Sequence, residues 1–139
     1  MCIRDRYSTA PSPESVQGLV NSYHVMRTAD AQRQSLNENV LYFQKKVSAM
    51  SFDGARWVDS SSAVQALIIS DTERVKALAQ KFHAAGFALK AITSPTVAKG
   101  SDRIRICLHA HNTYEQIDVF AKVLQTNSML IQGHTEVMA

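Results

Sequence analysis

Residues 94–108 read SPTVAKGSDRIRICL, which is a turn followed by a strand with two unlike faces. The turn opens with a proline and closes with a glycine, and side chains then alternate across the strand. One set points toward a core, and its members are Ile104, Ile106, Leu108 and Ala110. The opposite set is polar and comprises Arg103, Arg105, Cys107 and His109. The alternation therefore predicts a strand that is buried on one face and polar on the other.

The two arginines on the polar face suit an anionic ligand. A guanidinium presents a flat fork of donors that matches a carboxylate or phosphate in two-point contact. A half-buried sheet whose polar face is simply solvated has the same alternation. On the alternation alone, the solvated surface is the favoured interpretation.

The periodicity on either side of this segment predicts alternating helices and strands. Ser12 followed by Pro13 marks a helix start, Gly86 marks a helix end, and Thr113 with Gln116 forms a capping box. We expect helices over 13–27, 30–50, 71–85 and 113–124, strands over 63–69, 87–92 and 103–110, and a short strand near 57–58. Because a short loop joins the last two strands, they should be antiparallel neighbours. The predicted fold is α/β of the α+β type, a short mainly antiparallel sheet covered on one face by helices.

Composition excludes several classes of protein. The formal net charge is only +3, and the 15 basic residues are scattered, which argues against a nucleic-acid surface. The two cysteines have no CxxC spacing, which favours a reducing compartment over a disulfide framework. No apolar run reaches the ~20 residues of a membrane span, and no signal peptide is visible. We therefore expect a cytoplasmic protein with no nucleic-acid and no membrane partner.

Three short strings in the chain resemble a known enzyme family. Pro95-Thr96-Val97, then Arg103-Ile104-Arg105-Ile106, then a helix opening at Asn112-Thr113 are similar to the carboxy-terminal part of the α-oxoamine synthases. These are pyridoxal-phosphate enzymes of the aspartate-aminotransferase fold. The string Ser62-Ala63-Val64-Gln65 resembles the biotin-pathway branch of the family more than its sister branches. The resemblance implies the small carboxy-terminal domain of a fold-type-I pyridoxal-phosphate enzyme, which in full length is a homodimer.

The resemblance also implies a reaction and a set of binding residues. The family condenses an amino acid with an acyl-CoA and releases carbon dioxide, using pyridoxal 5'-phosphate as the electron sink. Arg105 matches the residue that binds the substrate carboxylate, and Thr96 matches a threonine that contacts substrate. Ser8 and Thr9 match a segment that reaches the cofactor phosphate of the neighbouring subunit. Arg103 is expected to form a structural ion pair.

The same resemblance implies that catalytic groups are missing from this sequence. The family's Schiff-base lysine lies in a Gly/Ser-Lys-Ala/Gly setting, and none of the seven lysines here has that setting. We therefore expect no catalytic residue in the chain and no activity from the chain alone. The expected organisation is a non-native leader over 1–6, a helical segment over 7–50 that links from a large domain, and a small α/β domain over 51–139.

Three other interpretations stay open at this point. Cys107, His109 and His111 alternate along one strand and would meet at a metal, although a fourth ligand is missing, so no metal is expected. A sister synthase that uses glycine, such as glycine C-acetyltransferase, shares most of the family pattern. A free-standing α/β module would instead use the Thr96 and Arg105 surface to bind an anion or a partner. An exposed apolar surface would favour the enzyme fragment over the free-standing module.

Overall fold

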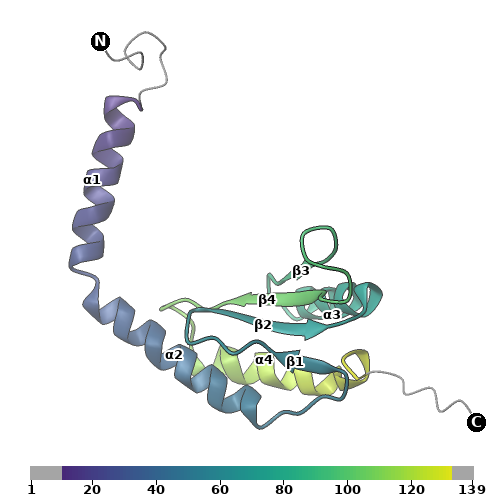
Figure 1. Ribbon diagram of the computed structural model, residues 1–139. Coiled ribbons are helices and arrows are strands. Elements are labelled where there is room, and N and C mark those ends of the chain that lie inside the picture. The colour runs from purple at the N-terminus through teal and green to yellow at the C-terminus, as the bar shows by residue number, and fades with distance from the viewer. Residues whose placement is uncertain (1–10, 133–139) are drawn as a thin grey trace, which may run out of the picture. The chain divides into compact units, whose positions relative to one another are not determined.

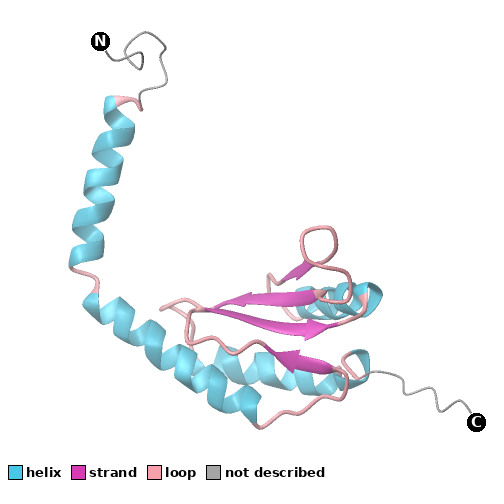
Figure 2. Cartoon of the chain, viewed as in Figure 1, coloured by secondary structure: helices cyan, strands magenta, loops and turns pink. Residues whose placement is uncertain are grey.

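The computed structural model describes residues 11–132 (Figures 1 and 2). It divides into two compact units, residues 1–33 and 34–139. The described elements follow in chain order: α1 (Pro13–Arg27), α2 (Asp30–Ser48), β1 (Ala55–Trp57), β2 (Val64–Ile69), α3 (Thr72–Ala84), β3 (Lys90–Ile92), β4 (Arg103–Cys107), α4 (Tyr114–Thr126) and the 3₁₀ turn η2 (Ser128–Leu130). None of the helices among residues 11–132 is long and apolar enough to cross a membrane.

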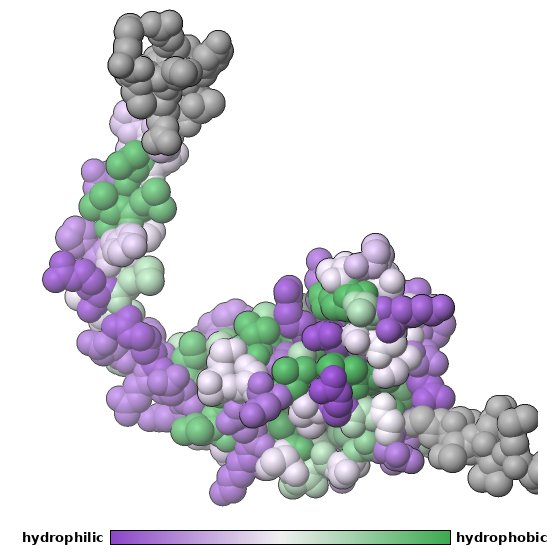
Figure 3. Space-filling model, in the orientation of Figure 1, coloured by the Kyte–Doolittle hydropathy of each residue, from purple (hydrophilic) through white to green (hydrophobic). Residues whose placement is uncertain are grey.

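Helix α1 begins and ends where the sequence predicts. The hydroxyl of Ser12 accepts the backbone N–H of Ser15 at 3.2 Å, and Pro13 occupies the first helical position. No residue of α1 is buried. Its large apolar side chains recur at helical spacing and are exposed, namely Val16, Leu19, Val20, Tyr23 and Met26. Figure 3 shows hydrophobic residues exposed on the surface of α1.

The four strands form one antiparallel sheet in the order β1-β2-β4-β3. The predicted antiparallel pairing of the last two strands is confirmed. The third strand is shorter than the predicted 87–92, because its first residues are used to end α3. The N–H of Phe87 donates to the carbonyl of Phe82 at 2.9 Å, and the N–H of Gly86 donates to that of His83 at 3.0 Å. These two bonds define a Schellman motif, so pairing with β4 starts only at Lys90.

Strand β4 is also shorter than the predicted 103–110. The N–H of Leu108 still donates to the carbonyl of Ala63 at 2.9 Å, on the adjoining segment. The next N–H, that of His109, donates to Oδ1 of Asn112 at 2.7 Å. The side chain of Asn112 thus closes a turn, and the strand ends at Cys107.

Helices α3 and α4 and most of α2 cover one face of the sheet (Figure 1). Three helices and the inner face of the sheet contribute the fully buried side chains, which include Phe43, Leu67, Ile69, Val75, Leu78, Phe82, Ile104 and Leu124. The ring of Phe120 links the helices, since its centroid lies 4.7 Å from that of Phe82 and 5.4 Å from that of Phe43. The predicted fold, a small mainly antiparallel sheet with helices on one face, is confirmed.

Candidate functional site

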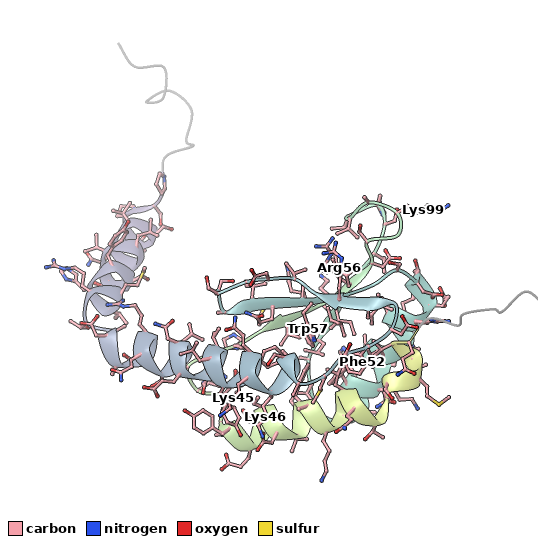
Figure 4. The ribbon with its side chains drawn as sticks, turned by 60° about the horizontal axis from the view of Figure 1, so that its bottom comes forward. Lys45, Lys46, Phe52, Arg56, Trp57 and Lys99 are labelled. Carbon is pink, nitrogen blue, oxygen red and sulfur yellow. The ribbon has the colours of Figure 1, made fainter. Side chains whose placement is uncertain are left out.

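The face of the sheet turned away from the helices carries the cationic side chains. Directly paired residues in neighbouring strands share a face, and Arg56 pairs with Ile68, which in turn pairs with Arg103. The strand residues on this open face are Arg56, Val64, Ala66, Ile68, Lys90, Ile92, Arg103, Arg105 and Cys107. Figure 4 shows Arg56 on this side, whereas Trp57 and Phe52 lie toward the helices. Four of the nine residues are cations, and none is acidic.

Arg105 lies in the middle of the open face. Its partner in β2 is Ala66, and its partner in β3 is Lys90. The side chain is exposed, and the flanking residues Ile104 and Ile106 are buried on the other face. The apolar half of β4 therefore anchors the strand in the core and holds Arg105 toward solvent. A rigid strand is a suitable support for a guanidinium that must meet an anion in a fixed geometry.

Within residues 11–132, Arg103 does not form the expected ion pair. Its Nε donates to the backbone carbonyl of Ser101 at 3.0 Å, and it is half-buried. Within residues 11–132 the ion pairs are Asp30–Arg33, Lys46–Asp118, Asp71–Arg74 and Glu73–Lys76. The reason is that no carboxylate shares the open face, so the backbone turn is the acceptor within reach.

Thr96 lies in the loop between β3 and β4, which Figure 1 shows curling above the sheet. The N–H of Thr96 donates to the carbonyl of Thr93 at 3.0 Å, and the N–H of Ser101 donates to that of Ala98 at 3.0 Å. Gly100 has φ +79°, which a residue with a Cβ adopts only with strain. The Thr96 side chain is exposed. Two consecutive turns thus place Thr96 in the loop just before β4, which begins at Arg103.

Asp102 holds this loop in place, a role that the sequence pattern did not reveal. It is only 3% exposed. Its Oδ2 accepts from the Thr72 hydroxyl at 2.6 Å, and its Oδ1 accepts from the backbone N–H of Ser94 at 3.1 Å. Its carbonyl accepts the N–H of Ile69 at 2.8 Å. One buried carboxylate therefore connects the start of α3, the end of β2 and the loop that carries Thr96.

Asparagine side chains organise the opposite end of β4. Nδ2 of Asn39, on α2, donates to the carbonyls of His109 and Asn112 at 3.0 and 2.9 Å. The rings of His109 and His111 stack with centroids 5.0 Å apart. Because β4 ends at Cys107, His111 does not continue the alternation that would bring three ligands together. Within residues 11–132 no group of three potential ligands is placed to bind a metal ion.

A pocket of about 290 Å³ opens at this same end of β4. Its walls are mostly apolar and include Phe43, Phe87, Leu89, Ile106, Leu108 and Phe120. It forms because residues 86–89 leave the sheet to complete the turn after α3. Neither Thr96 nor Arg105 lines it. Of the predicted substrate residues, Arg105 lies on the open face and Thr96 lies in the loop that precedes β4. Ser8 and Thr9 lie outside the described residues.

No protein-family model matches the chain. In sequence it is 36% identical over 118 residues to the 8-amino-7-oxononanoate synthase of Photorhabdus laumondii. The matched region covers 85% of this chain and 30% of that protein. The fold resembles a high-resolution structure of SPT with a PLP internal aldimine, with a TM-score of 0.78, 24% identity, and 92% of this chain and 32% of that chain covered. It also resembles 8-amino-7-oxononanoate synthase from Francisella tularensis, with a TM-score of 0.70, 19% identity, and 88% and 34% covered.

These findings confirm the family resemblance. The fold is that of the carboxy-terminal domain of pyridoxal-phosphate-dependent enzymes, and the chain is related to the α-oxoamine synthases. In particular, three curated relatives that it matches are 8-amino-7-oxononanoate synthases. The chain spans about 30% of their length.

The described residues do not by themselves make a pyridoxal-phosphate site. Such a site needs a lysine in a closed pocket, which burial and neighbours make nucleophilic. All seven lysines of the sequence are described, and six of them are exposed. The seventh, Lys46, is half-buried and paired with Asp118 at 2.7 Å. The open face offers groups that suit an anion, but its strand lysine, Lys90, is exposed and not enclosed in a pocket.

Proposed function

We propose that this chain is the substrate-carboxylate-binding part of a pyridoxal-phosphate-dependent C-acyltransferase. The reaction would be that of the curated relatives, in which L-alanine condenses with pimeloyl-CoA, or a pimeloyl carrier protein, with loss of carbon dioxide to give 8-amino-7-oxononanoate. The observation that carries the proposal is Arg105, exposed on an acid-free face in a region 36% identical to such an enzyme. The exposed apolar stripe of α1 fits a chain whose relatives are about three times longer.

In this proposal each residue of the chain has a limited task. When bound to the complete enzyme, pyridoxal phosphate supplies the electron sink. Arg105 binds the amino-acid carboxylate through two parallel N–H donors. A carboxylate that is held at two points fixes the rotation of the amino acid about its Cα, which orients the bond that breaks. Thr96, presented by the loop that Asp102 anchors, offers a hydroxyl to the same substrate.

The remaining assignments follow the family. Ser8 and Thr9 would bind the cofactor phosphate across a homodimer interface, since hydroxyls and backbone amides at a turn suit a phosphate. The Schiff-base lysine would come from a part of the enzyme that is not in this sequence. The chain alone is therefore expected to be inactive, and a cytoplasmic homodimer is the expected active form.

The test is a chimera built on a working relative. The 118 matched residues of this chain replace the matching region of the Photorhabdus laumondii enzyme, and the condensation is assayed with L-alanine, glycine and L-serine. Activity with L-alanine supports the proposal. Preference for L-serine would instead favour the second candidate, a serine palmitoyltransferase, which the fold similarity allows.

Variants of the chimera test the role of Arg105. Arg105→Gln should lower kcat/KM for the amino acid about 100-fold, because a two-point charged contact is lost. Arg105→Lys should recover only part of this loss, since an ammonium lacks the fork geometry. Arg27→Gln, an exposed arginine of α1, removes the same charge elsewhere and should leave kcat/KM within twofold. An Arg105→Gln chimera with unchanged kinetics would refute the assigned role.

A further inference from the structure

Lys90 and Arg105 are directly opposite each other in the β3–β4 ladder. Directly paired residues of an antiparallel sheet share a face, with Cβ atoms about 5 Å apart, and like charges in this arrangement are destabilising. Both side chains are exposed on the open face. The sheet therefore holds two cations side by side at the position where the proposed function needs one.

No carboxylate of the sheet neutralises this pair. The other open-face strand residues are apolar, cationic or cysteine, and no ion pair within residues 11–132 includes Lys90 or Arg105. Asp102 is the acidic residue closest in sequence to β4. Its carboxylate is buried and accepts from Thr72 and from Ser94. Unlike a solvated surface of mixed charge, this face carries a net positive charge.

The β2 residues beside the pair are small or apolar. On the β2 side, Arg105 is next to Ala66, whose side chain is a single methyl group. Beyond it, Ile68 is on the open face and yet only 6% exposed, flanked by Arg56 and Arg103. Long cationic side chains cover apolar surface with their stems while their charged ends stay in water. Figure 3 shows hydrophilic and hydrophobic residues side by side over the strands.

We propose that Lys90 and Arg105 together form a two-cation site for a small oxyanion, a carboxylate or a phosphate, on the open face of the sheet. This inference rests on the proposed carboxylate-binding role of Arg105 and adds Lys90 as its second cation. The guanidinium supplies two parallel donors and the ammonium supplies a third. A dianion balances both charges, so it binds more tightly than a monoanion. Bound anion also removes the repulsion between the two side chains.

The site is tested on the full 139-residue chain with simple anions. Amide shifts in ¹H–¹⁵N spectra are followed during titration with inorganic phosphate, malonate and acetate, at constant ionic strength set by sodium chloride. Phosphate and malonate should shift the amides of residues 90–92 and 103–107, and acetate should bind more weakly. Lys90→Gln should weaken phosphate and malonate binding about fivefold, the effect of one unit charge about 4 Å away in water. Lys90→Arg should retain the binding.

Lys45→Gln is the matched control, because it removes the same charge from an exposed position on α2. An equal loss of affinity in Lys45→Gln and Lys90→Gln would overturn the site, since net charge would then explain it. Shifts that lie outside β3 and β4 would also overturn it. Thermal unfolding gives an independent measurement: in dilute chloride Lys90→Gln should unfold at a higher temperature than the wild type, and phosphate should stabilise it less.

The outcome is separable from that of the proposed function. If the chimera is inactive but the free chain binds anions specifically, the acyltransferase assignment is refuted. The two-cation site is supported by the same result. If the chimera is active, and Lys90→Gln changes neither its KM for L-alanine nor the anion affinity of the free chain, the role of Lys90 is refuted. The proposed acyltransferase function would then still stand.

Discussion

Asp102 is the single residue on which the geometry of the candidate site depends most. It has no neighbour in sequence that signals its role, yet its carboxylate joins Thr72 and Ser94, which are 30 and 8 positions away. A buried acceptor of this kind fixes a loop because the N–H and hydroxyl that it satisfies would otherwise be buried without a partner.

Asp102→Ala should therefore lower the free energy of unfolding by about 1–3 kcal/mol. It should also increase the hydrogen exchange of the amides in the loop that carries Thr96, because the Ser94 N–H loses its acceptor. Urea unfolding and amide exchange measure the two effects. Asp53→Ala, at an exposed turn, is the control and should change the free energy by less than about 0.5 kcal/mol. Equal effects from the two variants would contradict the assigned role.

The carboxylate of Asp118 should make the stability of the fold depend on pH. The ammonium of Lys46 lies 2.7 Å from its carboxylate, and the Tyr42 hydroxyl donates to it at 3.0 Å. These contacts hold the pKa of Asp118 below its usual range, with Lys46 the larger cause. Since the folded-state pKa is the lower one, the stabilisation is present above the unfolded pKa of about 4 and is lost as the pH falls through the folded pKa.

The urea midpoint of the wild type should therefore fall more between about pH 5 and pH 2 than that of Asp118→Asn. The asparagine keeps an acceptor for Tyr42 but has no charge to lose. Asp53→Asn controls for the removal of any carboxylate. If the wild type and Asp118→Asn had parallel pH profiles, the Lys46–Asp118 contact would not contribute to stability. The same contact raises the pKa of Lys46, so the pair persists on the alkaline side.

At the scale of the element, the helices are defined by their end residues. Thr113 and Gln116 form the predicted capping box, and Asp71 caps α3 by accepting the N–H of Arg74 at 2.9 Å. Gly86, with φ +86°, ends α3, and the ring of Phe87 packs against that of Phe82 at 6.0 Å. This hydrophobic contact usually accompanies a Schellman motif. The same turn pulls residues 87–89 out of the sheet.

Gly86→Ala should destabilise the chain by about 1–2 kcal/mol. The Cβ would meet no atom within 4 Å, so the whole effect comes from forcing a left-handed backbone on alanine. Gly18→Ala is a matched control, because its Cβ also meets nothing within 4 Å but its backbone is helical. It should not destabilise α1 and should raise helix content. Urea unfolding and circular dichroism compare the two variants. Equal losses of unfolding free energy would contradict the view that the left-handed backbone at Gly86 causes the destabilisation.

At the scale of the whole molecule, the aromatic cluster between α2, α3 and α4 holds the helical layer together. Phe82 is fully buried and stacks on Phe120 with ring centroids 4.7 Å apart. Because all these side chains lie on one side, the sheet keeps its other face free for the cations. The hydrophobic core and the proposed binding site thus use opposite faces of the same strands.

Phe82→Ala should lower the free energy of unfolding by about 3–5 kcal/mol, a large share of the 5–15 kcal/mol of a typical domain. Phe82→Leu should lower it less, because more of the cavity stays filled. Leu41→Ala, at a position on α2 that is 66% exposed, should change it by less than about 0.5 kcal/mol. Urea titrations provide the values, and a Phe82→Ala loss no larger than that of Leu41→Ala would contradict the assigned core.

The amino-acid sequence by itself determined the helix starts at Pro13, Thr72 and Tyr114, the two faces of β4 and the antiparallel pairing of β3 with β4. These features depend on caps, alternation and short loops, which act between residues close together in the chain. Only the tertiary structure decided that Lys90 faces Arg105, that Asp102 anchors the Thr96 loop, and that Asn39 closes the end of β4 from 70 residues away. Such contacts depend on register and burial, which arise only when distant segments pack together.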